Sequence, residues 1–279
     1  MNRAGGLDPI YIAARHVLLD SLEAVEQHLD SLILVGAQAV YLQTGEAGIA
    51  VAPYTTDGDL MIDPRQLKNE PRIEVAMRNA GFSPEENAVG IWQRTIEMEG
   101  VNRNINVDLL VPESLGGQGR RAARIPPHGR RTARKVSGLE GALVDRDVFT
   151  VAALDPGDPR RFQLFVAGPA ALLVAKVHKI LDRVDNPDRR NNKDALDVYR
   201  LLQGTTTEEL VGRFRTLLAD PMSSVVAQVT ARKLPQLFGR EQAAGTRMAV
   251  AAAVPFENEE TLAASLVVLT QDLLEAISQ

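Results

Sequence analysis

The sequence has no cysteine, no apolar run long enough to span a membrane, and no uninterrupted apolar stretch near its start. Without cysteine, the chain forms no disulfide, binds no metal through thiolates and carries no cysteine nucleophile. Its longest apolar runs, such as Met248–Val254, fall well short of the roughly 20 residues that a membrane-spanning helix requires. Asp8 interrupts the region where a signal peptide would be continuously apolar. These absences predict a cytoplasmic protein with no membrane partner.

Three common kinds of binding site also lack support in the sequence. The histidines, which show no spacing typical of metal ligands, are His16, His28, His128 and His178. No P-loop signature for phosphate binding occurs. The stretch Gly117–Ala122 matches a glycine-rich dinucleotide fingerprint, but no strand leads directly into it and no strand–helix–strand unit follows. We therefore discount dinucleotide binding.

Charge is distributed unevenly along the chain. The net charge of the 279 residues is −5 at pH 7, yet the window Gln118–Lys135 holds seven basic residues and no acid, which leaves −12 for the remainder. The seven are Arg120, Arg121, Arg124, Arg130, Arg131, Arg134 and Lys135. Arginine and lysine contact phosphates, so this basic segment is a candidate to bind RNA, although it has no aromatic side chain on which bases would stack. The alternative is a solvated, mobile loop.

The first half of the chain mixes helix and strand signals. Apolar residues recur at helical spacing after Asp8 and Pro9, which suit a helix cap and a first turn. Short apolar runs bounded by turn residues predict strands. The expected elements are helices over 10–29, 37–42 and 64–80, strands over 32–35, 57–62, 91–98, 104–111 and 148–153, and a hairpin over 99–103.

From Pro169 onward the apolar spacing is helical, with helices expected over 169–184, 189–202 and 207–218 and further helical segments up to Ile277. Apolar residues make up 45% of the chain, enough to bury the core of one large domain or two modest ones. We predict two domains, an α/β (α+β) core over 1–165 with a mixed sheet and an all-helical region over 166–279.

Two carboxylates are spaced for one face of a strand. Successive strand side chains point to opposite faces, so Asp57 and Asp59 project from the same one. Two like charges that close cost free energy unless a cation neutralises them. Asp108 lies within an otherwise apolar strand. If that strand pairs beside the first, three carboxylates converge and supply the oxygen ligands that Mg²⁺ takes, with two ions acting on a phosphoryl group.

The alternative for the carboxylate pair is a tight turn, because the dipeptide Asp57-Gly58 is of a type favoured in hairpins. Upstream, a strand that ends in Gly36-Ala37 and opens a helix presents backbone N–H groups and the helix N-terminus to phosphate oxygens. Together with Asp108, this phosphate cradle favours the metal site over the turn.

These residues resemble the polymerase-beta-like nucleotidyltransferase superfamily, whose pattern is a small-residue turn, an Asp-x-Asp pair and a third strand carboxylate. Gly36-Ala37, Asp57, Asp59 and Asp108 match that pattern. The resemblance implies a nucleotidyltransferase core, with two Mg²⁺ ions as cofactor and an NTP as substrate. It implies that Asp57, Asp59 and Asp108 are the metal ligands.

Within the superfamily, the chain is most similar to the AbiE-type and MenT-type nucleotidyltransferase toxins. Those have Ser or Thr two residues before the first Asp, as Thr55 is here, and a Lys-bearing helix followed by a helix with a basic-Asp-x-x-Asp element, here Lys176 and then Asp194 and Asp197. The resemblance implies that Lys176 binds the triphosphate and that one or both acids assist. The alternative is that Lys176 lies on the solvated edge of its helix and that Asp194 and Asp197 make surface pairs with Arg190, Lys193 or Arg200.

The function that follows from the resemblance is transfer of NMP to an acceptor hydroxyl, such as a tRNA 3′ end, by the toxin of a toxin–antitoxin pair with a cognate antitoxin. The implied catalytic residues are Asp57, Asp59, Asp108, Lys176, Asp194 and Asp197. The implied nucleotide-binding residues are Gly36, Ala37, Thr55, Thr56 and Lys176. Two alternatives stay open, an enzyme of the same core that modifies an aminoglycoside-type small molecule and a non-catalytic nucleotide-binding protein of the same fold.

Overall fold

The computed structural model describes residues 7–45, 51, 53–183 and 192–278. Its strands are β1 (Leu32–Val35), β2 (Asp57–Ile62), β3 (Ser83–Pro84), β4 (Ile91–Met98), β5 (Val101–Pro112), β6 (Arg134–Val136), β7 (Arg146–Ala152) and β8 (Arg161–Ala167). Its α-helices are α1 (Pro9–Ala24), α2 (Gly36–Thr44), α3 (Ile73–Asn79), α4 (Pro169–Leu181), α5 (Asn192–Gly204), α6 (Thr207–Ala219), α7 (Ser224–Phe238), α8 (Ala244–Ala253) and α9 (Glu259–Ser278). Short 3₁₀ helices are η1 (Glu26–Ser31), η2 (Glu113–Leu115) and η3 (Glu140–Leu143).

The chain forms two compact units. The sheet unit consists of residues 1–38, 52–136 and 148–166, and the helical unit consists of residues 39–51, 137–147 and 167–279. The sequence places one boundary near residue 165, and the chain does pass from one unit to the other there. It also passes between them at four earlier points, so each unit is built from separate stretches of sequence.

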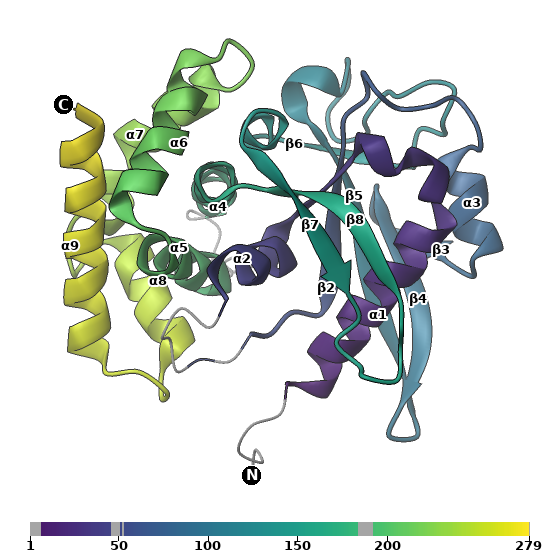
Figure 1. Cartoon of the computed structure of the whole chain (residues 1–279), viewed down its shortest axis with the longest axis horizontal. Coiled ribbons are helices and arrows are strands. Elements are labelled where there is room, and N and C mark those ends of the chain that lie inside the picture. The colour runs from purple at the N-terminus through teal and green to yellow at the C-terminus, as the bar shows by residue number, and fades with distance from the viewer. Residues whose placement is uncertain (1–6, 46–50, 52, 184–191, 279) are drawn as a thin grey trace. The chain divides into compact units, whose positions relative to one another are not determined.

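The sheet is mixed, as the sequence predicts. Its strands run in the order β3-β4-β5-β2-β1-β8-β7, and β6 pairs with β5 off this path (Figure 1). Strand β2 lies between β1, to which it is antiparallel, and β5, to which it is parallel. Strands with neighbours on both sides are apolar on both faces in α/β folds, and the four residues of β1 are all buried. The polar residues of β2 therefore lie in the middle of the sheet, between β1 and β5.

Helix α1 covers one face of the sheet. Its N-cap is Asp8, whose side chain accepts from the Ile10 N–H, and Pro9 occupies the first turn. Leu18 of α1 packs so closely over Gly58 that a Cβ at that glycine would lie 3.2 Å from the Leu18 Cβ. Because strand residues alternate, the neighbours of Gly58 on β2 point to the face opposite α1.

The helical unit is built around α4. This helix contacts α5, α6, α7 and η3, and α5 packs on α8 and α9. Asp145 closes the N-terminus of α4, since its Oδ2 accepts from the Ala171 N–H at 2.8 Å and its Oδ1 lies 2.8 Å from Arg213 Nη1. Burial raises the pKa of Asp145, with Ala171 and Arg213 acting in the opposite direction. The helical C-terminal region is as the sequence predicts.

Several predicted boundaries were wrong. The helix expected over 64–80 is only α3, because the Asp63 carboxylate accepts from the Arg65 N–H to form a turn and Pro71 has no N–H to donate. The first helix ends at Ala24 and continues as η1. The hairpin needs only Glu99 and Gly100, both at positive φ, so β5 begins earlier than expected.

Strands β3, β6 and β8 were not predicted. Two of them are only two or three residues long, too short to show an alternating pattern. Among the helical predictions, α4 ends at Leu181, before the expected 184, and α5 begins at Asn192 in the described part of the chain. The expected helix start at 189–191 and the expected end at 184 lie outside the described residues.

Helix α9 is long and apolar enough, by length and composition alone, to cross a membrane, and among the described residues it is the one helix that is. The buried helix of a globular core passes the same test, so the length and composition of α9 do not establish a membrane span. In this structure α9 packs against α6, α7 and α8 through buried residues such as Leu262 and Leu266.

Candidate active site

Three predicted carboxylates lie on one face of two adjacent strands. In the β2–β5 pair, Asp59 is the register partner of Asp108, and Asp57 is the partner of Asn106. Side chains of paired residues lie on the same face, and residues two apart on a strand share it. The strand adjacency that the sequence reasoning required is therefore confirmed, and the tight-turn alternative for Asp57 is excluded because β2 begins there.

Gly36 lies against Asp59 where β1 ends and α2 begins. Val35 is the register partner of Asp59, so the following turn passes directly by that carboxylate. Gly36 has φ +70°, and a Cβ at this position would overlap the Asp59 carboxylate. The conformation and the close approach both require glycine. Ala37, the other half of the predicted phosphate cradle, is the second residue of α2.

The Asp57 carboxylate is oriented by Thr55, which lies two residues before the start of β2. Thr55 Oγ1 donates to Asp57 Oδ1 at 2.5 Å, and Thr55 is buried, whereas Thr56 is exposed. Gln38 Nε2 donates to the Asp57 carbonyl at 2.9 Å, and Arg15 Nε donates to Gln38 Oε1 at 2.6 Å. This chain of hydrogen bonds links α1 and α2 to the start of β2.

Arg15 and Gln38 are functional candidates that were not predicted from the sequence. Both are buried, at 2% and 1% exposure, and burial lowers the pKa of Arg15. Arg15 Nη1 also donates to the Ala152 carbonyl at 2.8 Å. A charged residue on the apolar side of an amphipathic helix was the one sequence signal available, because Arg15 lies among the buried positions of α1.

Asp108 forms an ion pair with Arg134. The Arg134 Nη2 lies 2.5 Å from Asp108 Oδ2, and the two side chains are 28% and 10% exposed. Arg134 is the first residue of β6 and the register partner of Leu110, so backbone pairing with β5 sets its place beside the site. The sequence places Arg134 in the basic segment that is a candidate to bind RNA, and this pairing was not predicted.

Asn106 is a further polar residue on the carboxylate face. Its Oδ1 is buried and has no hydrogen-bond partner among the residues that the structure describes. A buried amide oxygen without a partner is uncommon, because it loses its hydration without compensation. The sequence signal was the alternation of β5, which puts Asn106 on the same side as Asp108.

The donor set on this face suits a hard cation such as Mg²⁺, because it consists of carboxylate and amide oxygens. As the side chains lie, however, the described residues contain no cluster of three or more acids or histidines arranged to hold one metal ion. Asp108 is paired with the Arg134 guanidinium.

Three residues of the basic segment bind within the sheet unit. Besides Arg134, the Arg131 Nη2 donates to the carbonyls of Glu85, Glu86 and Ala88 at 2.8–2.9 Å. Lys135 Nζ donates to the Gly117 carbonyl at 3.0 Å and also to that of Gly119. The basic residues of the segment that are exposed and donate no such bond to another described residue are Arg120, Arg121, Arg124 and Arg130.

Lys176, Asp194 and Asp197 form a buried cluster in the helical unit, between α4 and α5. Lys176 Nζ lies 3.0 Å from Asp194 Oδ1 and 2.6 Å from Asp197 Oδ2, and all three side chains are at most 5% exposed. Lys179 Nζ lies 3.1 Å from the same Asp194 oxygen. The alternative of surface pairs is wrong, because these charges are buried.

Electrostatics in this buried cluster favours the ionised forms. Burial alone would lower the pKa of Lys176, but Asp197 and Asp194 outweigh it and raise that pKa well above its usual range. Burial alone would raise the pKa of Asp194, but Lys176 and Lys179 outweigh it and lower that pKa to about 2. Lys176 is therefore a charged residue whose ammonium already has two partners.

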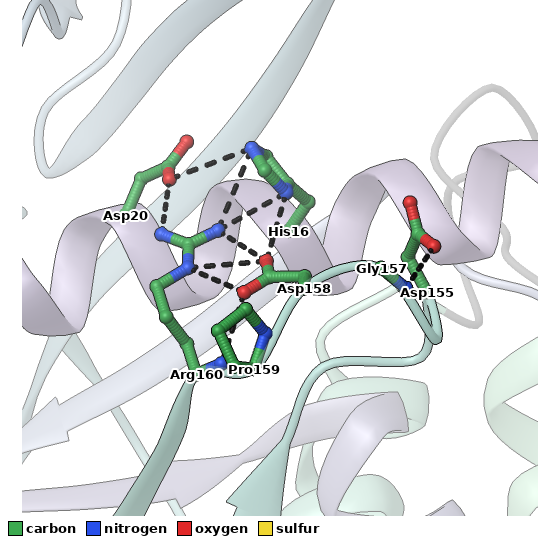
Figure 2. A pocket seen from close by; sticks show the side chains of 7 residues that line it. All are labelled: His16, Asp20, Asp155, Gly157, Asp158, Pro159 and Arg160. Carbon is green, nitrogen blue, oxygen red and sulfur yellow. Dashed lines mark hydrogen bonds and ion pairs between the residues drawn. The ribbon is translucent and has the colours of Figure 1, made fainter.

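A separate pocket of about 540 Å³ opens beside α1 and the turn between β7 and β8. Figure 2 shows Arg160 at its centre, pointing toward His16, Asp20 and Asp158. The distances from Arg160 nitrogens to Asp20 Oδ1 and to Asp158 Oδ2 are both 2.6 Å. Arg160 lowers the pKa of Asp158 to well below its usual range. Within this pocket, His16, Asp20, Asp158 and Arg160 pair with one another, Asp155 accepts from the Gly157 N–H, and no predicted site residue is included.

No protein-family model, curated protein or solved structure matches the chain.

Proposed function

We propose that this chain is a metal-dependent nucleotidyltransferase that transfers a nucleoside monophosphate from an NTP to an acceptor hydroxyl. The observation that carries the proposal is the face shared by Asp57, Asp59 and Asp108, beside the turn at Gly36 that opens α2. Carboxylates supply oxygen ligands for Mg²⁺, and the start of a helix supplies N–H donors for phosphate.

In the proposed reaction, the acceptor hydroxyl oxygen forms a bond to the α-phosphorus, the bond from that phosphorus to the bridging oxygen breaks, and pyrophosphate leaves. Asp57 and Asp59 would hold Mg²⁺, whose positive charge would offset the negative charge that develops on the transferred phosphate. Thr55 keeps Asp57 oriented through its 2.5 Å hydrogen bond. Asp108 is either a further ligand or the carboxylate that takes the hydroxyl proton.

Lys176 enters the proposal as a cation for the triphosphate, with Asp194 and Asp197 holding it in place. Lysine acts on phosphate as a point charge. Since both acids already contact Lys176 Nζ, at 3.0 and 2.6 Å, phosphate oxygens would have to replace one of them. Asp194 is the better candidate to be displaced, because Lys179 also lies within 3.1 Å of it and can retain it.

We propose an RNA acceptor, such as a tRNA 3′ end, for the same reaction. The support is the group of exposed arginines in a chain that is otherwise acidic. An enzyme that acts on tRNA and uses cellular NTPs would work in the cytoplasm, and a toxin of this kind would require an antitoxin as partner.

The deciding experiment incubates the protein with each α-labelled NTP, Mg²⁺ and total tRNA. We expect label on RNA with wild type and with the exposed-acid control Asp30→Asn, and none with Asp59→Asn. A non-catalytic nucleotide-binding protein would transfer no label with any nucleotide, and that outcome would contradict the proposal.

Comparing two acceptors, RNA and a small hydroxyl compound, distinguishes the RNA proposal from the small-molecule alternative. We expect the exposed variants Arg120→Ala, Arg121→Ala and Arg124→Ala, combined, to lower transfer to RNA while leaving pyrophosphate release with a small hydroxyl acceptor unchanged. Arg131 and Arg134 are not suitable for this test, because both bind within the sheet unit. Unchanged labelling of RNA in the triple variant would contradict a role of the segment in RNA binding.

A further inference from the structure

Two buried histidines of the sheet unit have no part in the proposed reaction. His28 of η1 and His128 of the basic segment are 1% and 7% exposed, and their rings pack edge to face with centroids 5.7 Å apart. His28 Nε2 lies 2.7 Å from the Pro71 carbonyl oxygen, and His128 Nε2 lies 3.0 Å from that of Lys68. Because a carbonyl oxygen can only accept, each Nε2 carries a proton and donates it.

These two bonds hold the turn over residues 67–71, which precedes α3. In the described part of the chain, no backbone–backbone hydrogen bond joins this turn to another element, and its hydrogen bonds to other elements are those from His28 and His128. Residues 68–70 are exposed. A segment with few buried contacts opens at a lower free energy than the core, so the histidine bonds determine how firmly the turn is held.

The second nitrogen of each ring suits only the neutral imidazole. His128 Nδ1 accepts from the Ile73 N–H at 3.2 Å, a bond that a proton on Nδ1 would break. His28 Nδ1 is buried and has no hydrogen-bond partner among the described residues, so a proton there would create a buried imidazolium whose second N–H has no acceptor. Burial lowers the pKa of His28, and although the bond to Pro71 opposes it, His128 and Lys68 add to it.

The charged groups near the two rings leave the histidines as the groups that titrate near neutral pH. Burial raises the pKa of Glu74 on α3, but bonds from Gly129 and Thr132 and the nearby His128 outweigh burial and lower it. The other charged residues of α1, η1, the stretch 63–73, α3 and the basic segment beside His128 are Arg15, Asp20, Glu23, Glu26, Asp30, Asp63, Arg65, Lys68, Glu70, Arg72, Arg78, Arg124, Arg130 and Arg131. Acids and bases of ordinary pKa other than histidine keep their charge between pH 5.5 and 7.5.

We propose that His28 and His128 form an acid-sensitive clasp, in which proton uptake breaks their bonds and releases the turn 67–71 and the start of α3 from η1 and from the basic segment. The exposed Arg124 and Arg130 lie within four residues of His128, so release also loosens the backbone that carries them. The clasp requires no nucleotidyl transfer and is independent of the function proposed above.

The direction of the pH effect follows from the lowered pKa of His28. Opening of the turn returns this histidine to its ordinary pKa of 6.5, so the opened form takes up a proton as the pH falls below that value. The closed form is therefore most stable above pH 6.5 and loses stability below it. From pH 7.5 to 5.5, we expect the equilibrium constant for opening to increase about tenfold for each histidine that takes up a proton.

The test is amide hydrogen exchange of the full chain at pH 7.5 and 5.5, corrected for the intrinsic exchange rates. We expect the amides of Ile73–Met77 to show this increase and to exchange faster than those of β1 at both pH values, because they open locally. His28→Gln keeps a neutral N–H donor for Pro71 and should lose the increase that belongs to His28. The double variant with His128→Gln should show no increase, whereas the control His16→Gln, at a histidine that is 49% exposed, should behave as wild type.

Wild type alone keeps the proposal testable if the variants do not fold. Titration of the His28 ring by nuclear magnetic resonance must then give a midpoint below pH 6.5. A midpoint at or above 6.5, an opening constant that does not change between pH 7.5 and 5.5, or exchange of Ile73–Met77 only together with β1 would each overturn the inference. Unchanged pH dependence in a folded His28→Gln variant would overturn it as well.

Discussion

At the scale of single residues, Gly36 is constrained both by its backbone conformation and by its close contact with Asp59. It has φ +70° and faces the Asp59 carboxylate with no space for a Cβ. We expect Gly36→Ala to lower the free energy of unfolding by about 1–2 kcal/mol for the backbone and by about 1–3 kcal/mol more for the collision. It is also expected to abolish Mn²⁺ binding, because Asp59 must move. Urea unfolding and Mn²⁺ titration measure the two effects.

Gly45 is the matched control for Gly36. It also has a positive φ, +55°, but no atom of the described residues lies within 4 Å of the position of its Cβ. Gly45→Ala should therefore show only the backbone cost and retain Mn²⁺ binding. Equal losses of unfolding free energy in the two variants would mean that the contact with Asp59 contributes nothing.

At the scale of elements, the ion pairs of Lys176 join α4 to α5, and their strength depends on pH. The pKa of Asp194 is about 2 in the folded protein, below its ordinary 3.8. A lowered folded-state pKa contributes stability that is complete above the ordinary value and is lost as the pH falls through the folded value. We expect Asp194→Asn to lower the free energy of unfolding by about 2 kcal/mol at pH 7.

That difference between wild type and Asp194→Asn should shrink as the pH falls from about 4 toward about 2, because protonation then removes the same charge from the wild type. Urea unfolding at a series of pH values measures it, with the exposed Asp272→Asn on α9 as control. A difference that stays constant down to pH 3 and below would show that the charge of Asp194 does not stabilise the fold.

The elements that could be predicted from the sequence are those whose residues repeat one pattern over several positions. Strands β1, β2 and β5 and helices α4 and α6 are of this kind. Strand β6 could not be found, because its three residues lie in a basic segment and pair with β5 only through the fold. For the same reason, the contact between Arg134 and Asp108, 26 positions away, could not be predicted.

The carboxylates of the candidate site were accessible to sequence reasoning because strand alternation is local, so the spacing of Asp57 and Asp59 fixes their common face. The burial of the other site residues and the side chains with which they pair could not be derived from the sequence. Lys176 looks like an exposed helix residue from its neighbours in sequence, and only the packing of α5 on α4 buries it with two acids. Burial and pairing depend on contacts between distant segments.

At the scale of the whole molecule, the helical unit depends on residues from the first half of the chain. It includes residues 39–51 and 137–147, which a cut near residue 165 would remove. Within the second stretch, all four residues of η3 are buried and η3 contacts α4 and α7. Asp145 from the same stretch closes the start of α4 through the Ala171 N–H.

We therefore expect a fragment of residues 167–279 to fold poorly compared with a fragment of residues 137–279. Loss of η3 exposes apolar surface of α4, and loss of Asp145 leaves the α4 N-terminal N–H groups and the Arg213 guanidinium without their partner. The shorter fragment should show a broader urea transition and faster amide exchange in α4. If both fragments unfold with the same cooperativity and midpoint, residues 137–147 are not part of the folding unit, and the helical region is independent from residue 167 onward.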